Sequence, residues 1–107
     1  MYEYKIKEVA KVVDGDTVDI IIDLGFGLTK KERVRLVGID TPESRTKDLE
    51  EKELGLDAKD FLERRMRDCD KLWVRTEKDG KYGRMLGEIW CGVTNINEEM
   101  VSRGFAW

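Results

Sequence analysis

The spacing of hydrophobic residues changes near Leu54, and this change limits the fold more than any other feature of the chain. Over residues 17–24, apolar side chains occupy every second position, which is the period of a β-strand. Over residues 54–69, they recur at the three- and four-residue spacing of an amphipathic helix. Strand-like segments return after that. The chain therefore requires a fold in which one helix interrupts a series of strands.

We predict five strands and two helices. The pair Asp14-Gly15 is a turn signal, and Pro42, the only proline, closes the third strand before a polar loop. The strands are expected over residues 2–13, 17–24, 32–39, 71–76 and 84–90, the polar loop over 44–53, and the helices over 54–69 and 97–103. Five antiparallel strands of this kind close into a small Greek-key barrel, so the fold class is a β-barrel with helices, the OB-fold, with one long and one short α-helix.

Length and charge limit how the protein could work. A chain of 107 residues allows one domain, over residues 1–107, and no second lobe for a separate substrate. The 23 acidic residues outnumber the 20 basic ones, so bulk attraction cannot hold a nucleic acid. Any such binding needs local basic clusters or a bound cation. The absence of histidine excludes histidine general bases, histidine metal ligands and Ser-His-Asp chemistry.

The two cysteines and the N-terminus bear on the protein's surroundings. Cys69 and Cys91 stand 22 residues apart without other soft ligands nearby, which makes a zinc site a poor hypothesis. They could pair if the fold brings them together, but two buried reduced thiols are the favoured expectation. No apolar run resembles a signal peptide or a membrane span, so we expect no membrane partner.

Two acidic turns are candidates for holding a metal ion. Asp14 and Asp16 flank Gly15 at the first turn, and Asp40 and Glu43 follow the third strand. Hard cations such as Ca²⁺ take several oxygen ligands from carboxylates, main-chain carbonyls and water. Either turn alone has a simpler explanation, because aspartate is common in turns for local hydrogen-bonding reasons. Their value as a site depends on the two turns lying side by side.

Two arginines are candidates for binding a phosphate. Arg35 lies in the third strand and Arg84 opens the fifth. A guanidinium holds two phosphate oxygens in fixed geometry, and two of them with a divalent cation form an electrostatic clamp for a phosphoryl transition state. The alternative is that both are solvated strand residues, which is the common fate of arginine in a charge-rich chain.

Taken together, these segments resemble the signature of the staphylococcal-nuclease-like, or thermonuclease, family. The resemblance rests on residues 13–17 (VDGDT), 35–43 (RLVGIDTPE), 81–84 (KYGR) and 97–106 (NEEMVSRGFA), in that order, and extends from about residue 9 to the end. It implies a calcium-dependent nuclease that hydrolyses phosphodiester bonds of DNA or RNA and leaves 3′-phosphate ends. A non-catalytic OB-fold module that binds nucleic acid or protein is the alternative, and the intact set of acids and arginines favours the enzyme.

The resemblance also implies a role for each site residue. Ca²⁺ is bound by the carboxylates of Asp16 and Asp40 and the main-chain carbonyl of Thr41, with Asp14 as an outer-shell acid. Glu43 orients and deprotonates the attacking water. Arg35 and Arg84 are the implied catalytic contacts to the phosphate. Lys81 and Tyr82 are the implied substrate-binding contacts.

Two departures from the family pattern give further expectations. The hairpin around residues 25–29 is longer than usual, and we expect it to lie near the metal turns and alter substrate access. The chain stops at Trp107, short of the family's usual continuation, so base stacking must come from elsewhere, with Tyr82 and Trp107 as candidates, or be weak. We expect a monomer. Met1 followed directly by the domain favours an intracellular protein over a secreted one. A phage-encoded protein is compatible with this expectation.

Overall fold

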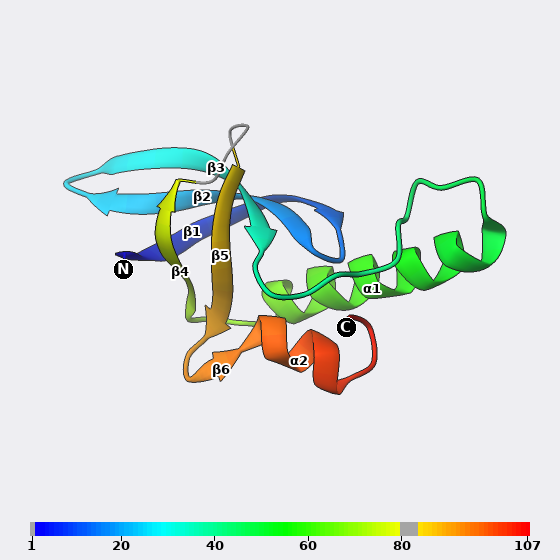
Figure 1. The fold of residues 1–107 in the computed structure, drawn as a ribbon. Helices are drawn as coiled ribbons and strands as arrows, with labels where there is room; N and C mark the ends of the chain where they lie inside the picture. The colour runs from blue at the N-terminus through cyan, green and yellow to red at the C-terminus, as the bar shows by residue number, and fades with distance from the viewer. Residues whose placement is uncertain (1, 80–83) are drawn as a thin grey trace.

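The protein folds as a β-barrel, and its two helices lie below the barrel in the view of Figure 1. The computed structural model describes residues 2–79 and 84–107. In this part of the chain the barrel strands are β1 (Tyr2–Asp14), β2 (Thr17–Gly25), β3 (Leu28–Leu36), β4 (Leu72–Asp79) and β5 (Arg84–Cys91). They pair in the order β3-β2-β1-β4-β5, and β3 pairs again with β5 to close the ring. The predicted five-stranded OB-type barrel with two helices is confirmed.

The closing strand pair differs from the expectation of an all-antiparallel barrel. β3 and β5 run parallel, with Arg33 opposite Arg84 and Leu36 opposite Gly87. The sequence also gave no sign of β6 (Thr94–Asn95), which pairs with the end of β5 and leads into α2. Two residues are too few for an alternating pattern to be recognised.

The strand β1 bends strongly because it carries bulges. Its register against β2 shifts after Ile6, after Val9 and after Val12, so one extra residue is inserted at every third position. Each bulge increases the local twist and changes which face the next side chain points to. Ile6 and Val12 are buried and Val9 is partly buried as a result. The alternation expected for a flat strand is therefore replaced by a three-residue repeat.

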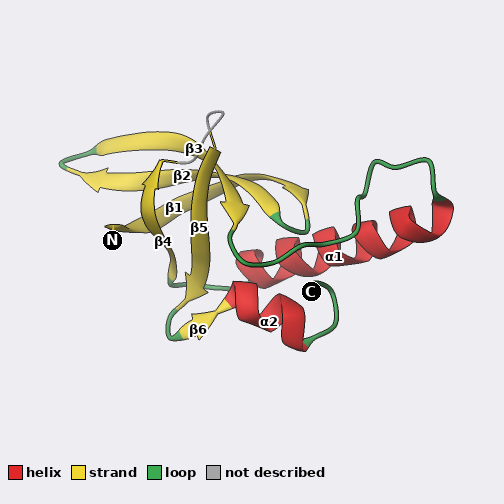
Figure 2. Cartoon of the chain, viewed as in Figure 1, coloured by secondary structure: helices red, strands yellow, loops and turns green. Residues whose placement is uncertain are grey.

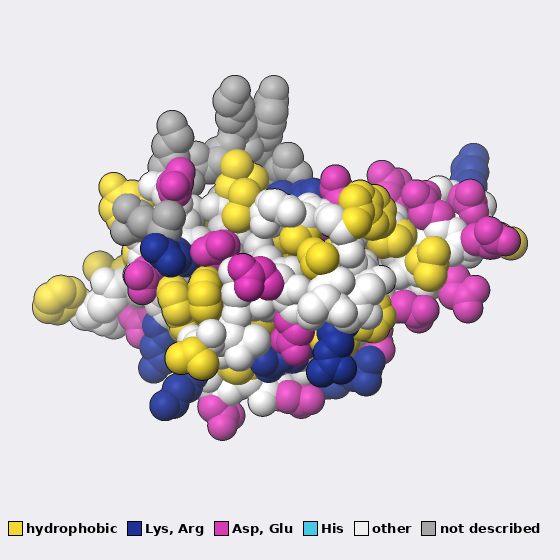
Figure 3. All heavy atoms as spheres, turned by 60° about the horizontal axis from the view of Figure 1, so that its bottom comes forward, with side chains coloured by type: hydrophobic (Ala, Val, Ile, Leu, Met, Phe, Trp, Pro, Cys, Tyr) yellow, Lys and Arg dark blue, Asp and Glu magenta, His cyan; other side chains and the backbone are white. Residues whose placement is uncertain are grey.

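The helix α1 (Leu49–Arg67) begins five residues before the predicted position, so the polar loop over 44–53 was predicted too long. Asp48 is the N-cap, and its carboxylate accepts hydrogen bonds from the main-chain N–H groups of Glu50 and Glu51 at 3.1 and 3.2 Å. The first turns extend beyond the barrel, and Leu49 is 78% exposed. Because these turns bury no apolar stripe, hydrophobic spacing could not show that they are helical. Acidic side chains gather at this end of the molecule (Figure 3).

The second helix matches its prediction closely. α2 (Ile96–Ser102) starts one residue before the expected Asn97, because Asn95 caps it by accepting from the N–H of Glu98 at 3.2 Å. Gly104 follows with φ of 83°, a conformation that favours glycine and stops the helix. Figure 2 shows both helices below the open end of the barrel. Neither helix in the described residues has the length and hydrophobicity to cross a membrane.

The hairpin tip around residues 25–29 lies at the end of β2 and β3 that is opposite the two acidic turns. Gly25 pairs with Leu28 at its tip, whereas Thr17 pairs with Arg35 at its other end. Eight residues of extended strand separate the two pairs, which is about 26 Å. The prediction that this loop lies near the metal turns is therefore wrong. The exposed side chains of Leu24, Phe26 and Leu28 project from this tip instead.

Cys69 and Cys91 form a disulfide, which corrects the expectation of two buried reduced thiols. Cys69 follows the end of α1, and Cys91 ends β5 opposite Leu72, the first residue of β4. The turn from α1 into β4 thus brings the two Cα atoms to 6.0 Å, which is within disulfide range. Both side chains are partly exposed. Their spacing of 22 residues could not reveal this contact, because it depends on how α1 docks.

One ion pair on the barrel wall should make stability depend on pH. Asp19 is 7% exposed, and Arg33 donates to its two carboxylate oxygens from Nε at 2.8 Å and Nη2 at 3.1 Å. This hydrogen bonding holds the pKa of Asp19 below its usual value, against a smaller opposing effect of burial. The same contact raises the pKa of Arg33. Because the folded pKa of Asp19 is depressed, its ionised form stabilises the fold above the unfolded pKa.

We expect that stabilisation to be lost as the pH falls through the folded pKa, below about pH 4. In urea unfolding followed by tryptophan fluorescence, the midpoint of the wild type should fall more steeply between pH 5 and pH 2 than that of Asp19→Asn. Asp57→Asn, which changes an exposed carboxylate on α1, should keep the steep wild-type slope. Parallel curves for wild type and Asp19→Asn would contradict the assignment.

Candidate active site

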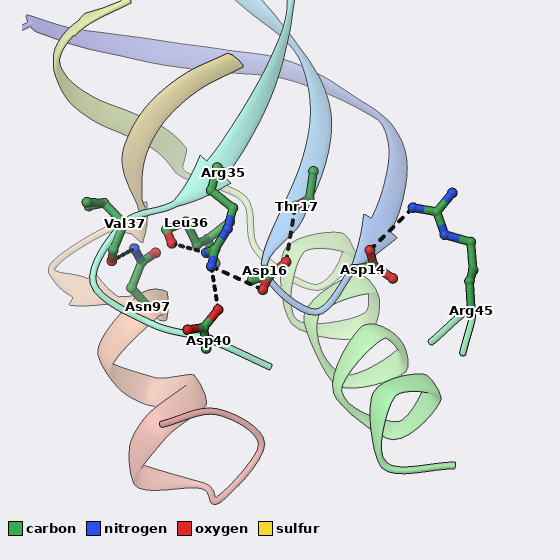
Figure 4. A network of polar contacts seen from close by, with 9 residues as sticks. All are labelled: Asp14, Asp16, Thr17, Arg35, Leu36, Val37, Asp40, Arg45 and Asn97. Carbon is green, nitrogen blue, oxygen red and sulfur yellow. Dashed lines mark hydrogen bonds and ion pairs between the residues drawn. The ribbon is translucent and has the colours of Figure 1, made fainter. Parts of the chain in front are cut away.

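Three segments meet at one end of the barrel. They are the β1–β2 turn, the end of β3 and the loop that leads from β3 to α1 (Figure 4). The N–H of Leu36 donates to the carbonyl of Asp16 at 2.8 Å, which ties the end of β3 to the turn. The N–H of Val37 donates to the carbonyl of Gly87 at 3.0 Å, which ties the same segment to β5. The two acidic turns predicted to lie side by side are therefore brought together.

Arg35 lies between the two predicted metal-binding carboxylates. Its Nη2 is 2.7 Å from Oδ1 of Asp40 and 3.4 Å from Oδ2 of Asp16 (Figure 4). Its Nη1 donates to the carbonyl of Leu36 at 2.6 Å, which holds the guanidinium at the end of its own strand. The side chains of Arg35 and Asp16 are 21% and 14% exposed, and that of Asp40 is 63% exposed. One guanidinium is thus shared by two carboxylates, and the three groups together keep a net negative charge.

The main chain of Asp40 is held by the last residue of the chain. Its N–H donates to the oxygen of Trp107 at 2.9 Å, and its carbonyl accepts from the N–H of Trp107 at 3.0 Å. Phe105 stacks on Phe61 of α1, which anchors the same tail to the helix. The indole of Trp107 itself is 68% exposed. The tail therefore supports the main chain of the site, a role that no local sequence pattern predicts.

Asp14 faces a different partner from Asp16. Its carboxylate accepts a hydrogen bond from Oγ of the buried Ser44. It also lies 3.6 Å from Nη2 of Arg45 (Figure 4). In the structure, Asp14 therefore connects the first turn to the loop after β3. Ser44 and Arg45 take part in this connection, and no pattern in the sequence had singled them out.

Thr41 and Glu43 lie in that loop with opposite exposures. Thr41 is 8% exposed, and its Oγ1 is a buried oxygen without a hydrogen-bond partner among the described residues. Glu43 is exposed, and its carboxylate forms no ion pair or hydrogen bond with the side chains described over residues 2–77 and 85–107. A carboxylate in such an exposed position is chemically able to accept a proton from a water molecule.

Asn97 is a further residue that the sequence did not identify as part of the site. It is buried in the first turn of α2, and its Nδ2 donates to the carbonyls of Val37 and Gly87 at 3.0 and 3.2 Å. Its Oδ1 accepts from the N–H of Ile89 at 3.1 Å. One side chain thus fixes the start of the β3–α1 loop against β5. The only sequence signal was its place in the family-like C-terminal segment.

The remaining predicted residues belong to the β4–β5 hairpin. Arg84 is the first residue of β5, and its main chain pairs with that of Arg33. Lys81 and Tyr82 lie outside the described residues. Within the described part of the chain, no three acidic or thiol side chains group together to hold a metal ion. Asp16 and Asp40 are thus two carboxylates beside Arg35 and not part of a larger acidic cluster in the described residues.

Comparison with known proteins identifies the family. A family model described as "Staphylococcal nuclease homologue" matches residues 33–107. This is more than half of the chain, and it includes Arg35, Asp40 and Glu43. The chain belongs to the staphylococcal nuclease family. The resemblance predicted from the sequence motifs is confirmed.

Individual members of this family align over most of the chain. The thermonuclease of Staphylococcus hyicus is 34% identical over 101 residues, which cover 92% of this chain and 56% of that protein. Micrococcal nuclease of Shigella flexneri is 31% identical over 112 residues, covering 94% and 56%. Staphylococcal-like nuclease CAN1 of Arabidopsis thaliana is 40% identical over 81 residues, covering 75% and 23%. The chain thus spans about half the length of these bacterial relatives.

Proposed function

We propose that this member of the staphylococcal nuclease family is a Ca²⁺-dependent nuclease that hydrolyses phosphodiester bonds of DNA or RNA and leaves 3′-phosphate ends. The observation that carries the proposal is the convergence of Asp16 and Asp40 on Arg35 at the open end of the barrel. Relatives named thermonuclease, micrococcal nuclease and staphylococcal-like nuclease support a nucleic-acid substrate. We further propose that the protein acts as a monomer.

The donor chemistry of the site fits Ca²⁺. Carboxylate oxygens of Asp16 and Asp40 and the main-chain carbonyl of Thr41 are hard oxygen ligands of the kind that this ion prefers. The two carboxylates lie within 3.4 Å of the same positively charged nitrogen, so they are close enough together to share a cation. The unpaired Oγ1 of Thr41 adds a buried oxygen nearby in the chain. When bound, the ion would supply positive charge that neutralises the phosphate and stabilises the negative charge of the transition state.

The protein's own residues then account for the steps of hydrolysis. Glu43 accepts a proton from the water that attacks phosphorus, and the bond from phosphorus to the 5′-oxygen breaks. The 5′-oxygen leaves as a hydroxyl after taking up a proton, and the phosphate stays on the 3′ side. We assign Arg35 and Arg84 to the phosphate oxygens, where a guanidinium matches the geometry and stabilises developing charge. Lys81, Tyr82 and the exposed indole of Trp107 are proposed as further substrate contacts.

A cleavage assay with and without the ion tests the proposal. Single-stranded DNA and RNA are incubated with the protein in Ca²⁺, and again after addition of EDTA. We expect cleavage in Ca²⁺, none in EDTA, and 5′-hydroxyl products that a polynucleotide kinase labels without prior phosphatase treatment. Binding of the oligonucleotide without cleavage in either condition would favour a non-catalytic nucleic-acid-binding module instead.

Replacing Asp40 should weaken Ca²⁺ binding. The change Asp40→Asn removes one negative ligand while keeping the side chain's size, and we expect the affinity to fall at least about tenfold, since even outer-shell changes cost that much at metal sites. Calorimetric titration with CaCl₂ measures the effect. Asp60→Asn alters an exposed acid on α1 and should bind Ca²⁺ like the wild type. Equal affinities for Asp40→Asn and the wild type would refute the assignment of this ligand.

A further inference from the structure

The helix α1 contains a glycine that its own conformation does not require. Gly55 is buried in the helix and is not among the glycines with positive φ. Glycine is one of the poorest helix formers, so alanine would suit the helix better here. The reason for Gly55 must therefore lie in what approaches the helix at this position.

The main chain of Glu43 is what approaches it. A Cβ atom on Gly55 would lie 2.5 Å from both the carbonyl carbon and the carbonyl oxygen of Glu43, and 2.7 Å from the nitrogen of Ser44. These distances are far shorter than van der Waals contact, and the atoms belong to the backbone rather than to a flexible side chain. The loop rests directly on the helix only because residue 55 has no side chain.

The same face of α1 also supports the turn that carries the acids. A Cβ atom on Gly15 would lie 2.7 Å from Cβ of Ala58 and 3.1 Å from Cγ2 of Thr41. Gly55 and Ala58 are three residues apart, so they lie on one face of the helix. The β1–β2 turn and the β3–α1 loop therefore meet on a common surface of small residues. The hydrogen bond from Ser44 to Asp14 joins them there.

We propose that Gly55 is a positioning residue for Glu43, and that its missing side chain sets the distance between the Glu43 carboxylate and the Arg35–Asp16–Asp40 cluster. The proposal rests on the proposed role of Glu43 as the general base. Gly55 contacts neither the substrate nor a metal ligand, and it acts through the main chain of residues 43 and 44. A side chain here would push Glu43 outward, because the helix side is closed and Glu43 is exposed to solvent on the other side.

The change Gly55→Ala tests this by separating turnover from stability. A displacement of about 1 Å in a catalytic group can cost on the order of 10²-fold in rate, so we expect kcat to fall about 10- to 100-fold. KM should change less than about threefold and Ca²⁺ affinity should change much less than kcat, because the displaced main chain is that of residues 43 and 44 and not that of Asp16, Asp40 or Arg35. The thermal midpoint should change little, since better helix propensity offsets the shifted loop. Glu53→Ala, an exposed change on the same helix, should match the wild type in all four measurements.

A second pair of variants shows that the effect comes from close approach. Gly15→Ala displaces the acidic turn, so it should lower Ca²⁺ affinity more than kcat. Adding Ala58→Gly removes its shortest clash and should restore part of that affinity. The same Ala58→Gly change should not restore turnover to Gly55→Ala, whose clash is with the backbone of Glu43.

A wild-type kcat for Gly55→Ala would overturn the proposal. So would losses of Ca²⁺ affinity and thermal stability in proportion to the loss of turnover, since those would indicate general misfolding. If the wild type itself does not cleave nucleic acid, the proposed function fails separately. In that case NMR amide shifts of residues 43 and 44 decide the structural part: they must move in Gly55→Ala and stay in place in Glu53→Ala, and unchanged shifts would overturn it.

Discussion

Replacing Arg35 by alanine should lower turnover by about two to three orders of magnitude and at the same time tighten Ca²⁺ binding. The loss of turnover follows from the removal of a preorganised charge at the phosphate, where single donors are worth about 10²- to 10³-fold. The tighter binding follows from the structure without substrate. There, Nη2 of Arg35 already bonds Asp40 at 2.7 Å and lies 3.4 Å from Asp16.

The guanidinium and the proposed metal ion would therefore compete for the same two carboxylates. Without Arg35, Asp16 and Asp40 lose their shared positive partner and repel each other, which a divalent cation relieves more strongly than one guanidinium does. We expect the dissociation constant for Ca²⁺ to fall about tenfold or more at low ionic strength, and less in high salt because exposed charges are screened. In the working complex, the phosphate would take over the guanidinium from the two acids.

Calorimetry and single-turnover kinetics on three variants measure these effects. Arg33→Ala is the matched control: it removes an arginine two residues away on β3 that pairs with Asp19 on the barrel wall, and should leave both quantities unchanged. Glu43→Gln should lose turnover but keep wild-type Ca²⁺ affinity, since its side chain has no contact with Asp16, Asp40 or Arg35 in the described residues. Weaker Ca²⁺ binding in Arg35→Ala than in wild type would contradict the competition between the guanidinium and the ion.

The sequence could place Arg35, Asp40 and Glu43 because they lie in one short segment. Spacing within a strand and the turn after it is local, so the segment of six residues from Arg35 to Asp40 is enough to bring the two side chains together. That the two acidic turns lie side by side was harder to predict, because their contact depends on closure of the barrel. The prediction of this contact came from the motifs that resemble the family. The exchange of hydrogen bonds between Asp40 and Trp107 joins residues far apart in sequence, and no local pattern encodes it.

The errors have the same physical origin. The start of α1 was missed because its first turns bury nothing, so a hydrophobic repeat had no cause to appear there. The hairpin tip was placed near the acids although the strand predicted over residues 17–24 already separates the two, since a strand adds about 3.3 Å per residue. The importance of Gly55 was invisible for a related reason. A glycine in a helix signals close approach only when the approaching chain, here Glu43, is known.

The disulfide between Cys69 and Cys91 supports the second large prediction. It closes a segment of 22 residues that contains most of β4 and β5 and joins the end of α1 to the end of β5. In the chain-entropy account, a cross-link over such a loop removes unfolded conformations worth about 3 kcal/mol. Small domains are stable by only about 5–15 kcal/mol, so this is a large share. Disulfides persist mainly in oxidising compartments, so the bond weighs against the expected intracellular location, which stays a prediction.

The double variant Cys69→Ala/Cys91→Ala should lose about 3 kcal/mol of unfolding free energy, and its thermal midpoint should fall by about 10–20 °C, as expected for a domain of this size. Adding a reductant should lower the midpoint of the wild type by a similar amount and leave that of the variant unchanged, because only the wild type has a bond to break. Mass spectrometry after alkylation should find no free thiol in the oxidised wild type. Two alkylated cysteines there, or a midpoint that does not respond to reductant, would contradict the bond. Because the loop between the cysteines holds the β4–β5 hairpin and Arg84, the reduced protein should lose activity on heating well before the oxidised one does.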